Sequence, residues 1–472
     1  MHGTAPIQWV PNEILDLIFE FVCAGPAKLQ KIQGDETPPV LQLSAVCSHW
    51  RSVLQFAPSL WAHIAVWFDA DGNIPRFETV QLFLERSKEK PLTLDIRFDH
   101  GGDAIQLQKI LDHPAFLAIA YQAHRWKFLS LTGQRPEDLC ILRAPVISSC
   151  PELETLQLFE FDECNVGFFL GFVSMPKLKH LPGEYFHPLH PTQDIPWHQL
   201  TQVGLDAMMH DVPRLVELCG NLLELDIHSD PYWEIDVPHL HTSTTHQNVE
   251  FLAVILWSLE PEGPETDTLK QLFKALSFPH LSGLQIIDDN YDSPDEKQIV
   301  VHCSFGMLDN FINECSSTLE QLTLHDISIS DSDLIALLRN LPSLTFISIQ
   351  DPHITSAGTP IDVICPLSTA FIKSLRVKTN PVLLPNLECI LLVIRNECDE
   401  TTLVKMIRSR WSIHEDSDDE DEDEDFAILE KVMVRIQMPV VDLEKLEPLK
   451  VLKEEGLEVS VRTGMLDVVD FI

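Results

Sequence analysis

Short apolar patterns recur along much of the chain. Four of them share the form P-x-L-x-x-L-x-[L/I]: PELETLQL (151–158), PHLSGLQI (279–286), PSLTFISI (342–349) and PNLECILL (385–392). The last two apolar positions of each copy are two residues apart, so both side chains point to one face of an extended strand. The proline precedes the strand, where its missing N–H costs no ladder hydrogen bond. The pattern therefore predicts a series of short strands.

The same apolar spacing without the proline extends the series. It occurs in LLELDI (222–227), NVEFLAV (248–254), TLEQLTL (318–324) and AILEKVMV (427–434), and more loosely at 126–131, 176–181 and 200–205. Most steps between copies lie in the low-to-mid twenties, and the longest leave room for a weak copy such as FIKSLRV (371–377). Segments between the copies, such as DLIALLRNL (333–341), have the apolar spacing of amphipathic helices. We therefore predict an α/β fold.

A period of about 20–29 residues with L-x-x-L-x-L resembles the leucine-rich repeat. The resemblance implies a solenoid over residues 124–412, because one repeat cannot bury its own apolar face. Residues 69–123 are expected to connect to the solenoid and to form its first cap. The asparagine or cysteine that follows the strand in regular repeats is missing, and that site holds Phe161, Ile327 or Pro352. We therefore expect an irregular solenoid with repeats of variable length.

The first sixty residues have a different, helical pattern. VPNEILDLIFEFV (10–22) predicts an amphipathic helix with Pro11 at its first position, where a missing N–H is harmless. A second helical pattern fills much of 40–66 until Pro58 breaks it, and a short third element follows. Three small helices bury little surface by themselves. We therefore expect this part to pack on a partner.

Three submotifs in this region, P-N-E-I-L-x-x-I-F, L-S-x-V-C-x-x-W-R and P-x-L-W-x-x-I, occur in one order over residues 9–66. Their order, spacing and residue types resemble the F-box motif, apart from Val10 in place of a leucine and a longer loop at 23–39. The resemblance implies an F-box of three helices over residues 5–68. It also implies docking on a Skp-family adaptor, and through the adaptor on a cullin-RING (SCF-type) ubiquitin ligase.

The resemblance also implies roles for single residues. Those expected to contact the adaptor, or to support that interface directly, are Pro11, Ile14, Leu15, Ile18, Val46, Cys47 and Trp50. Those expected to hold the three helices together are Phe19, Leu43, Leu60, Trp61 and Ile64. The sequence does not divide the two roles cleanly, and ordinary helical core is the alternative for each residue.

The charge balance limits the classes of molecule that the protein is expected to bind. The formal net charge is −39, whereas phosphate backbones are bound by clustered Lys and Arg. Nucleic acids and anionic membranes are therefore disfavoured, and a basic client protein is favoured. No apolar stretch approaches the ~20 residues of a membrane span, and no signal-peptide pattern opens the chain. The 11 scattered cysteines include no C-x-x-C pair, so we expect a reducing, cytoplasmic and/or nuclear location.

An acidic run, EDSDDEDEDED (415–425), interrupts the C-terminal part. Such a run repels itself and buries nothing, so residues 413–426 are expected to be a disordered insertion. Ser417, surrounded by acidic residues, is a candidate site for an acidophilic kinase, with a solvated spacer as the alternative. Residues 427–472 are expected to form the last repeat and the C-terminal cap.

Catalytic motifs are missing from the sequence. It has no G-x-S-x-G elbow, phosphate-binding loop, G-x-G-x-x-G or H-E-x-x-H. We therefore expect no enzyme activity, no cofactor and no metal site. Two functions remain open on these residues. One is a ligase substrate receptor whose solenoid binds a client protein, and the other is a non-ligase scaffold with an F-box-like cap.

Overall fold

The structure is a computed structural model of the 472-residue chain. It describes residues 10–29, 37–69, 74–99, 104–133, 147, 149–159, 173–183, 195–206, 212–229, 244–256, 265–289, 303, 305–353, 363–377, 381–396, 398–411, 426–438, 441–464 and 469–470. The chain divides into two compact units: Met1–Asp206 with Cys219–Asn221, and Ala207–Leu218 with Leu222–Ile472.

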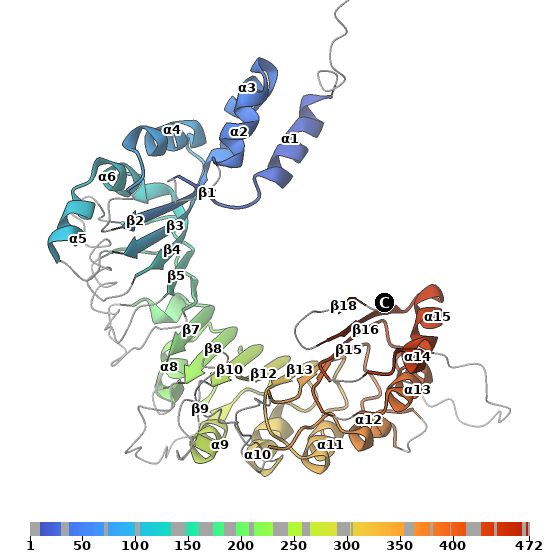
Figure 1. Ribbon diagram of the computed structural model, residues 1–472. Helices are drawn as coiled ribbons and strands as arrows, with labels where there is room; N and C mark the ends of the chain where they lie inside the picture. The colour runs from blue at the N-terminus through green and yellow to red at the C-terminus, as the bar shows by residue number, and fades with distance from the viewer. Residues whose placement is uncertain are drawn as a thin grey trace, which may run out of the picture. The chain divides into compact units, whose positions relative to one another are not determined.

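The first unit combines the N-terminal helices with a parallel sheet (Figure 1). Its helices are α1 (Asn12–Val22), α2 (Pro39–Val46), α3 (Ser48–Gln55), α4 (Phe77–Ser87), α5 (Ala104–Leu111) and α6 (Pro114–Ala120), with 3₁₀ turns η2 (Pro58–Trp61), η3 (Ala123–Arg125) and η5 (Trp197–Gln199). Its strands are β1 (Ala27–Lys28), β2 (His63–Asp69), β3 (Leu92–Asp99), β4 (Trp126–Thr132), β5 (Thr155–Phe159), β6 (His180–Leu181) and β7 (Gln202–Asp206). Each strand pairs in parallel with the next one in the chain.

The second unit repeats the same strand–helix alternation. Its helices are α8 (Val212–Leu218), α9 (Glu265–Ala275), α10 (Phe305–Cys315), α11 (Asp331–Arg339), α12 (Thr369–Ser374), α13 (Glu400–Trp411), α14 (Leu443–Leu446) and α15 (Pro448–Glu454). Its main sheet is formed by β8 (Glu224–Ser229), β10 (Phe251–Leu256), β12 (Gly283–Asp288), β13 (Gln321–His325), β14 (Phe346–Gln350), β15 (Cys389–Ile394), β16 (Lys431–Ile436), β17 (Glu458–Thr463) and β18 (Val469–Asp470). Only the β17–β18 pair is antiparallel among these described pairs. The short β9 (Thr244–Thr245) and β11 (Leu276–Ser277) form a separate parallel pair.

The strands of the second unit have one face toward the helices and one face away from them. Alternate side chains such as Leu322, Ile347 and Ile390 are 0% exposed, and α9–α13 lie along this side of the strands (Figure 1). No helix in the described ranges lies on the other face. Stacking the strands therefore buries a continuous apolar ladder that no single repeat could bury alone.

The predicted α/β class is confirmed in this coarse form: the parallel strands are consistent with a leucine-rich-repeat-like solenoid. All eleven apolar copies named above, from 126–131 to 427–434, lead into strands, β4 to β16. The weak copy proposed at 371–377 is wrong, because most of that segment lies in α12.

The sheet also begins earlier than the start of the solenoid expected at residue 124. Strands β2 and β3 already pair with each other and with β4. Their apolar residues alternate with polar ones, as strand faces require, but they lack the P-x-L start of the later copies. One residue lies in a different element for this reason: Ile64, expected in a short helical element, lies in β2.

The row of asparagines that follows the strands in regular leucine-rich repeats is missing, but polar contacts between charged residues one position earlier take its place. Asp326, Asp351 and Arg395 directly follow β13, β14 and β15, so they precede the sites that we had assigned to Ile327 and Pro352. The Arg395 guanidinium forms an ion pair with the Asp326 carboxylate and donates to the backbone carbonyl of Asp351. Phe161, the other site so assigned, lies outside the described residues.

This cluster is largely removed from water: the side chains of Arg395 and Asp326 are only 7% and 10% exposed. Asp351 is 0% exposed, and its carboxylate accepts backbone N–H bonds from Leu367 (3.0 Å) and Arg395 (2.9 Å). Burial still raises the pKa of Asp351 above its ordinary value, because desolvation outweighs those bonds. Arg395 also donates from Nε to Oε1 of Gln437, just after β16, at 2.8 Å. Charged and amide groups thus link the ends of four successive strands.

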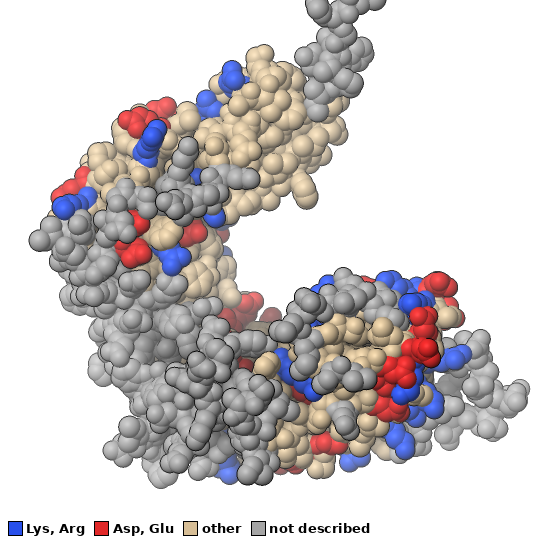
Figure 2. Space-filling view, in the orientation of Figure 1, with Lys and Arg blue, Asp and Glu red and all other residues tan. Residues whose placement is uncertain are grey.

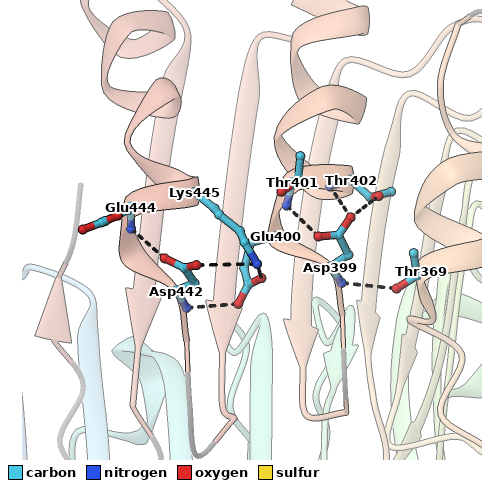
Figure 3. Close-up of polar contacts among 8 residues, drawn as sticks. All are labelled: Thr369, Asp399, Glu400, Thr401, Thr402, Asp442, Glu444 and Lys445. Atoms are coloured by element: carbon cyan, nitrogen blue, oxygen red, sulfur yellow. Dashed lines mark hydrogen bonds and ion pairs between the residues drawn. The ribbon is translucent and has the colours of Figure 1, made fainter.

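The last repeats are joined by a second polar cluster, on the helix side (Figure 3). The Asp399 carboxylate caps the start of α13, where it accepts from the backbone N of Thr401 (3.3 Å) and Thr402 (3.2 Å) and from the Thr402 hydroxyl (2.6 Å). Glu400, 8% exposed, accepts from the backbone N of Asp442 at 3.1 Å and pairs with Lys445 at 3.4 Å. These contacts connect α13 to α14, on either side of the acidic run.

Replacing Arg395 by methionine should destabilise the second unit strongly. The change leaves the buried Asp326 carboxylate without its cation, and removing one partner of a buried ion pair typically costs about 3–5 kcal/mol. Urea denaturation followed by circular dichroism measures the change in unfolding free energy. Arg339→Met, on an exposed position of α11, is the control, with an expected change of about 0.5 kcal/mol or less. Equal effects of the two variants would contradict a structural role for the cluster.

Replacing Asp399 by alanine should remove a pH-dependent contribution to stability. The Thr402 hydroxyl holds the pKa of Asp399 below its ordinary value, so the stabilisation is present above the unfolded-state pKa and is lost as pH falls through the folded-state pKa. We expect Asp399→Ala to cost about 1 kcal/mol at neutral pH and less in acid. Thermal melts across pH test this, with the exposed Glu454→Ala as control. A difference that stayed constant into acid would refute the explanation.

Candidate docking surface on the N-terminal helices

Helix α1 is held to the chain by one stripe of side chains. Its first turn begins at Pro11, whose carbonyl accepts the backbone N–H of Ile14 (3.1 Å) and Leu15 (3.0 Å). Leu15 and Phe19, one turn apart, are both 0% exposed. The Phe19 ring meets Trp50 of α3 edge-on, with centroids 5.0 Å apart. These are the only two buried residues of α1.

A second stripe on α1 is apolar and exposed. Ile14, Leu17, Ile18 and Phe21 lie at i, i+3, i+4 and i+7, so they share one helical face. Their exposed fractions are 47%, 63%, 42% and 85%. We call these four residues the α1 stripe. An isolated exposed apolar residue is ordinary, but a contiguous row on one face marks an interaction surface.

The predicted second helix is two helices, and Cys47 separates them. Its backbone is extended (φ −158°, ψ 169°), which ends α2 and starts α3. The Cys47 Sγ accepts the backbone N–H of Trp50 at 3.4 Å, as the capping side chain of α3. Cys47 therefore has a local structural role in addition to the one implied by the F-box resemblance. Helical spacing alone did not reveal the break because a cysteine cap is unusual.

The 3₁₀ turn η2 attaches the helices to the sheet. Trp61 is 0% exposed, donates from Nε1 to the carbonyl of Leu54 at 2.9 Å, and packs edge-on against Phe83 of α4 at 5.0 Å. The Arg86 guanidinium lies 4.4 Å from the centre of the Trp61 ring. Trp61 thus links α3 to α4.

The structure divides the residues singled out from the sequence into two groups. Exposed are Pro11, Ile14, Ile18 and Val46. Buried or half-buried are Leu15, Phe19, Leu43, Cys47, Trp50, Leu60, Trp61 and Ile64. Within the second group, Leu15 belongs with the core residues, so any part it takes in docking is indirect.

Four exposed apolar residues of these helices were not singled out from the sequence. Leu17 and Phe21 complete the α1 stripe, Val22 ends α1 at 45% exposure, and Phe56, 78% exposed, follows α3. The signal for the first two was present, since they continue the i, i+3, i+4 spacing from Ile14. In Figure 2 the visible surface over α1–α3 carries few charged side chains. The α1 stripe is therefore an exposed apolar row on a helix that also carries the exposed Glu13 and Glu20.

Other sites named from the sequence stay untested. Ser417 and the acidic run lie outside the described residues. In the part of the chain that the structure covers, no group of three or more His, Cys, Asp or Glu side chains is arranged to hold a metal ion. None of the helices described has the length and apolar content needed to cross a bilayer.

Comparison with known proteins adds little to these observations. No protein-family model matches the chain, and no curated protein does. Among solved structures, an internalin from Listeria monocytogenes matches 60% of this chain and 85% of its own, at 13% sequence identity and a TM-score of 0.28. A likeness this weak carries no argument about function, which has to come from the residues of this chain.

Proposed function

We propose that the chain is a substrate receptor of a cullin-RING (SCF-type) ubiquitin ligase, in which α1–α3 dock on a Skp-family adaptor and the solenoid binds a client protein. The observation that carries the proposal is the α1 stripe, an apolar helical face that the chain's own described residues leave exposed. It coincides with the region whose three submotifs resemble the F-box. The repeat region supplies a large surface for a protein client.

The α1 stripe has the chemistry of a helix that enters a groove. Fully burying one large aliphatic or aromatic side chain yields about 1.5–3 kcal/mol, and four such residues lie on one face here. Anchors at i, i+3, i+4 and i+7 are the usual pattern by which an amphipathic helix fills an apolar groove. Val46, 59% exposed at the end of α2, adds an apolar contact outside α1.

The few buried residues of α1 support the same interpretation. The helix packs on its own chain through Leu15 and Phe19, and a helix of this length is marginal without tertiary packing. A partner that covered the α1 stripe would stabilise the helix by burying its second side.

Ile18→Asp combined with Val46→Asp should abolish or strongly weaken adaptor binding. Each change buries a charge in the interface while sparing the buried residues Leu15 and Phe19, so the fold should persist. We expect at least a tenfold loss, about 1.4 kcal/mol, by isothermal titration with a purified Skp-family adaptor. Glu20→Gln, an exposed polar position on the same helix, is the matched control and should bind like the parent chain.

Two results would reject the docking proposal. One is a well-folded parent chain that does not bind the adaptor, and the other is a double variant that binds as tightly as the parent. Adaptor binding without ubiquitin transfer in a reconstituted complex with cullin and RING subunits would instead favour the non-ligase scaffold.

A further inference from the structure

One row of residues precedes the strands of the second unit, along the edge where the strands begin. Backbone hydrogen bonds join this row from strand to strand: Glu320 donates to Ser282 (2.8 Å), Thr345 to Glu320 (2.9 Å), Glu388 to Thr345 (2.9 Å) and Glu430 to Glu388 (2.8 Å). Glu250 has the equivalent place before β10, where it donates to Leu223 at 2.8 Å. We call Glu250, Glu320, Glu388 and Glu430 the glutamate edge.

The repeat sequence itself places these glutamates. Each one directly follows the first buried apolar residue of its copy, and all four of those residues are 0% exposed: Val249, Leu319, Leu387 and Leu429. The buried neighbour anchors the backbone, while all four glutamates are exposed. Because a glutamate occupies the same position in each of these four repeats, stacking the repeats places their carboxylates in a row.

The equivalent row in the first unit contains both basic and acidic residues, whereas the charged residues of this row are all acidic. There Lys127, Glu154 and Lys179 hold successive places, and Lys127 pairs with Glu154 at 3.4 Å. In the second unit the row from Leu223 to Glu430 contains no Lys or Arg. Within the described residues, none of the four edge glutamates forms an ion pair.

Such a row repels itself. Glu388 and Glu430 precede adjacent strands, which lie about 4.8 Å apart, and like charges at neighbouring places in a sheet are unfavourable. A bound cationic chain would relieve the repulsion. Without a bound cationic partner, the repulsion between these carboxylates would only destabilise the edge of the sheet.

Two aromatic side chains lie beside the glutamate edge, in the row of first strand residues, where Gly283 and Gln321 lie between them. Phe251 and Phe346, the first residues of β10 and β14, are half-buried there. The Phe251 ring lies against Gly283 of the neighbouring strand, so that a Cβ atom at Gly283 would clash with its Cδ2 and Cε2 atoms. The glycine thus leaves room for the aromatic ring.

We propose that the glutamate edge, together with Phe251 and Phe346, binds an extended, basic segment of the client protein, with Lys or Arg at every third residue and apolar residues between them. Glu250, Glu320 and Glu388 precede every second strand, so their spacing is about 10 Å. An extended chain in the polyproline II conformation has three residues per turn and rises about 3.1 Å per residue, so every third side chain returns to the same side about 9 Å further along. The proposal rests on the proposed role of the solenoid as the client-binding part.

Fluorescence anisotropy of the intact chain with labelled peptides tests this. The probes are a ten-residue peptide with lysine at every third position and leucine or phenylalanine between, a peptide of equal composition with its lysines contiguous, and a glutamate version of the first. We expect the spaced-lysine peptide to bind most tightly, with an affinity that falls as salt screens the charges. Equal binding of the spaced and contiguous peptides would overturn the register argument.

The triple variant Glu320→Gln, Glu388→Gln, Glu430→Gln should weaken binding of the spaced peptide at least tenfold. Its matched control is Glu85→Gln, Glu152→Gln, Glu154→Gln, which makes the same charge change in the first unit and should bind like the parent. Unchanged binding by the edge variant, or an equal loss in the control, would refute the site. Thermal melts check that both variants are folded.

Adaptor binding by the edge variant separates this inference from the docking proposal. The variant should bind a Skp-family adaptor like the parent chain while losing the peptide. A parent chain that binds the peptide but no adaptor would leave the glutamate edge standing and reject the docking role. A parent chain that binds the adaptor but no basic peptide would reject the glutamate edge as a binding site and leave the docking role standing.

Discussion

The parallel pairing of short strands is the constraint on which the rest of the structure depends. A single strand–helix repeat exposes its apolar side, and only stacking covers it. Stacking in register has a second effect: residues at equivalent places in successive repeats become neighbours. The row before the strands carries the glutamate edge, and the row after them carries the cluster around Asp326, Asp351 and Arg395. Residues that recur at one position of the repeats in the sequence thus form continuous rows in the structure, one exposed and one buried.

The N-terminal helices obey a different constraint. They lie outside the strand ladder and are joined to it through Trp61 and its neighbours. Helix α1 buries two residues and leaves five large apolar ones exposed, four of them in the α1 stripe. Such a helix gains by docking, whereas a helix on the covered side of the sheet is already packed. The structure thus contains an N-terminal helix with an exposed apolar row and, separately, helices that are packed on the strand ladder.

The sequence predicted the strands well because burial of alternate side chains demands a regular apolar pattern. It missed β2 and β3, whose alternation lacks the proline and first leucine of later copies, and it overread 371–377, where an apolar pattern belongs to a helix. The ladder at Asp326 and Arg395 was unpredictable from spacing, since it joins residues 69 positions apart. Exposure was also beyond reach: nothing in the spacing of Leu15 and Ile18 says that one is buried and the other open.

Amide hydrogen exchange on the intact chain, with and without a purified Skp-family adaptor, tests the central claim most directly. The account predicts that α1 exchanges faster than strands β10–β16 in the free chain, and that adding the adaptor protects α1–α3 while leaving those strands unchanged. A free chain in which α1 is as protected as the strands, or an adaptor that changes nothing in α1–α3, would contradict it.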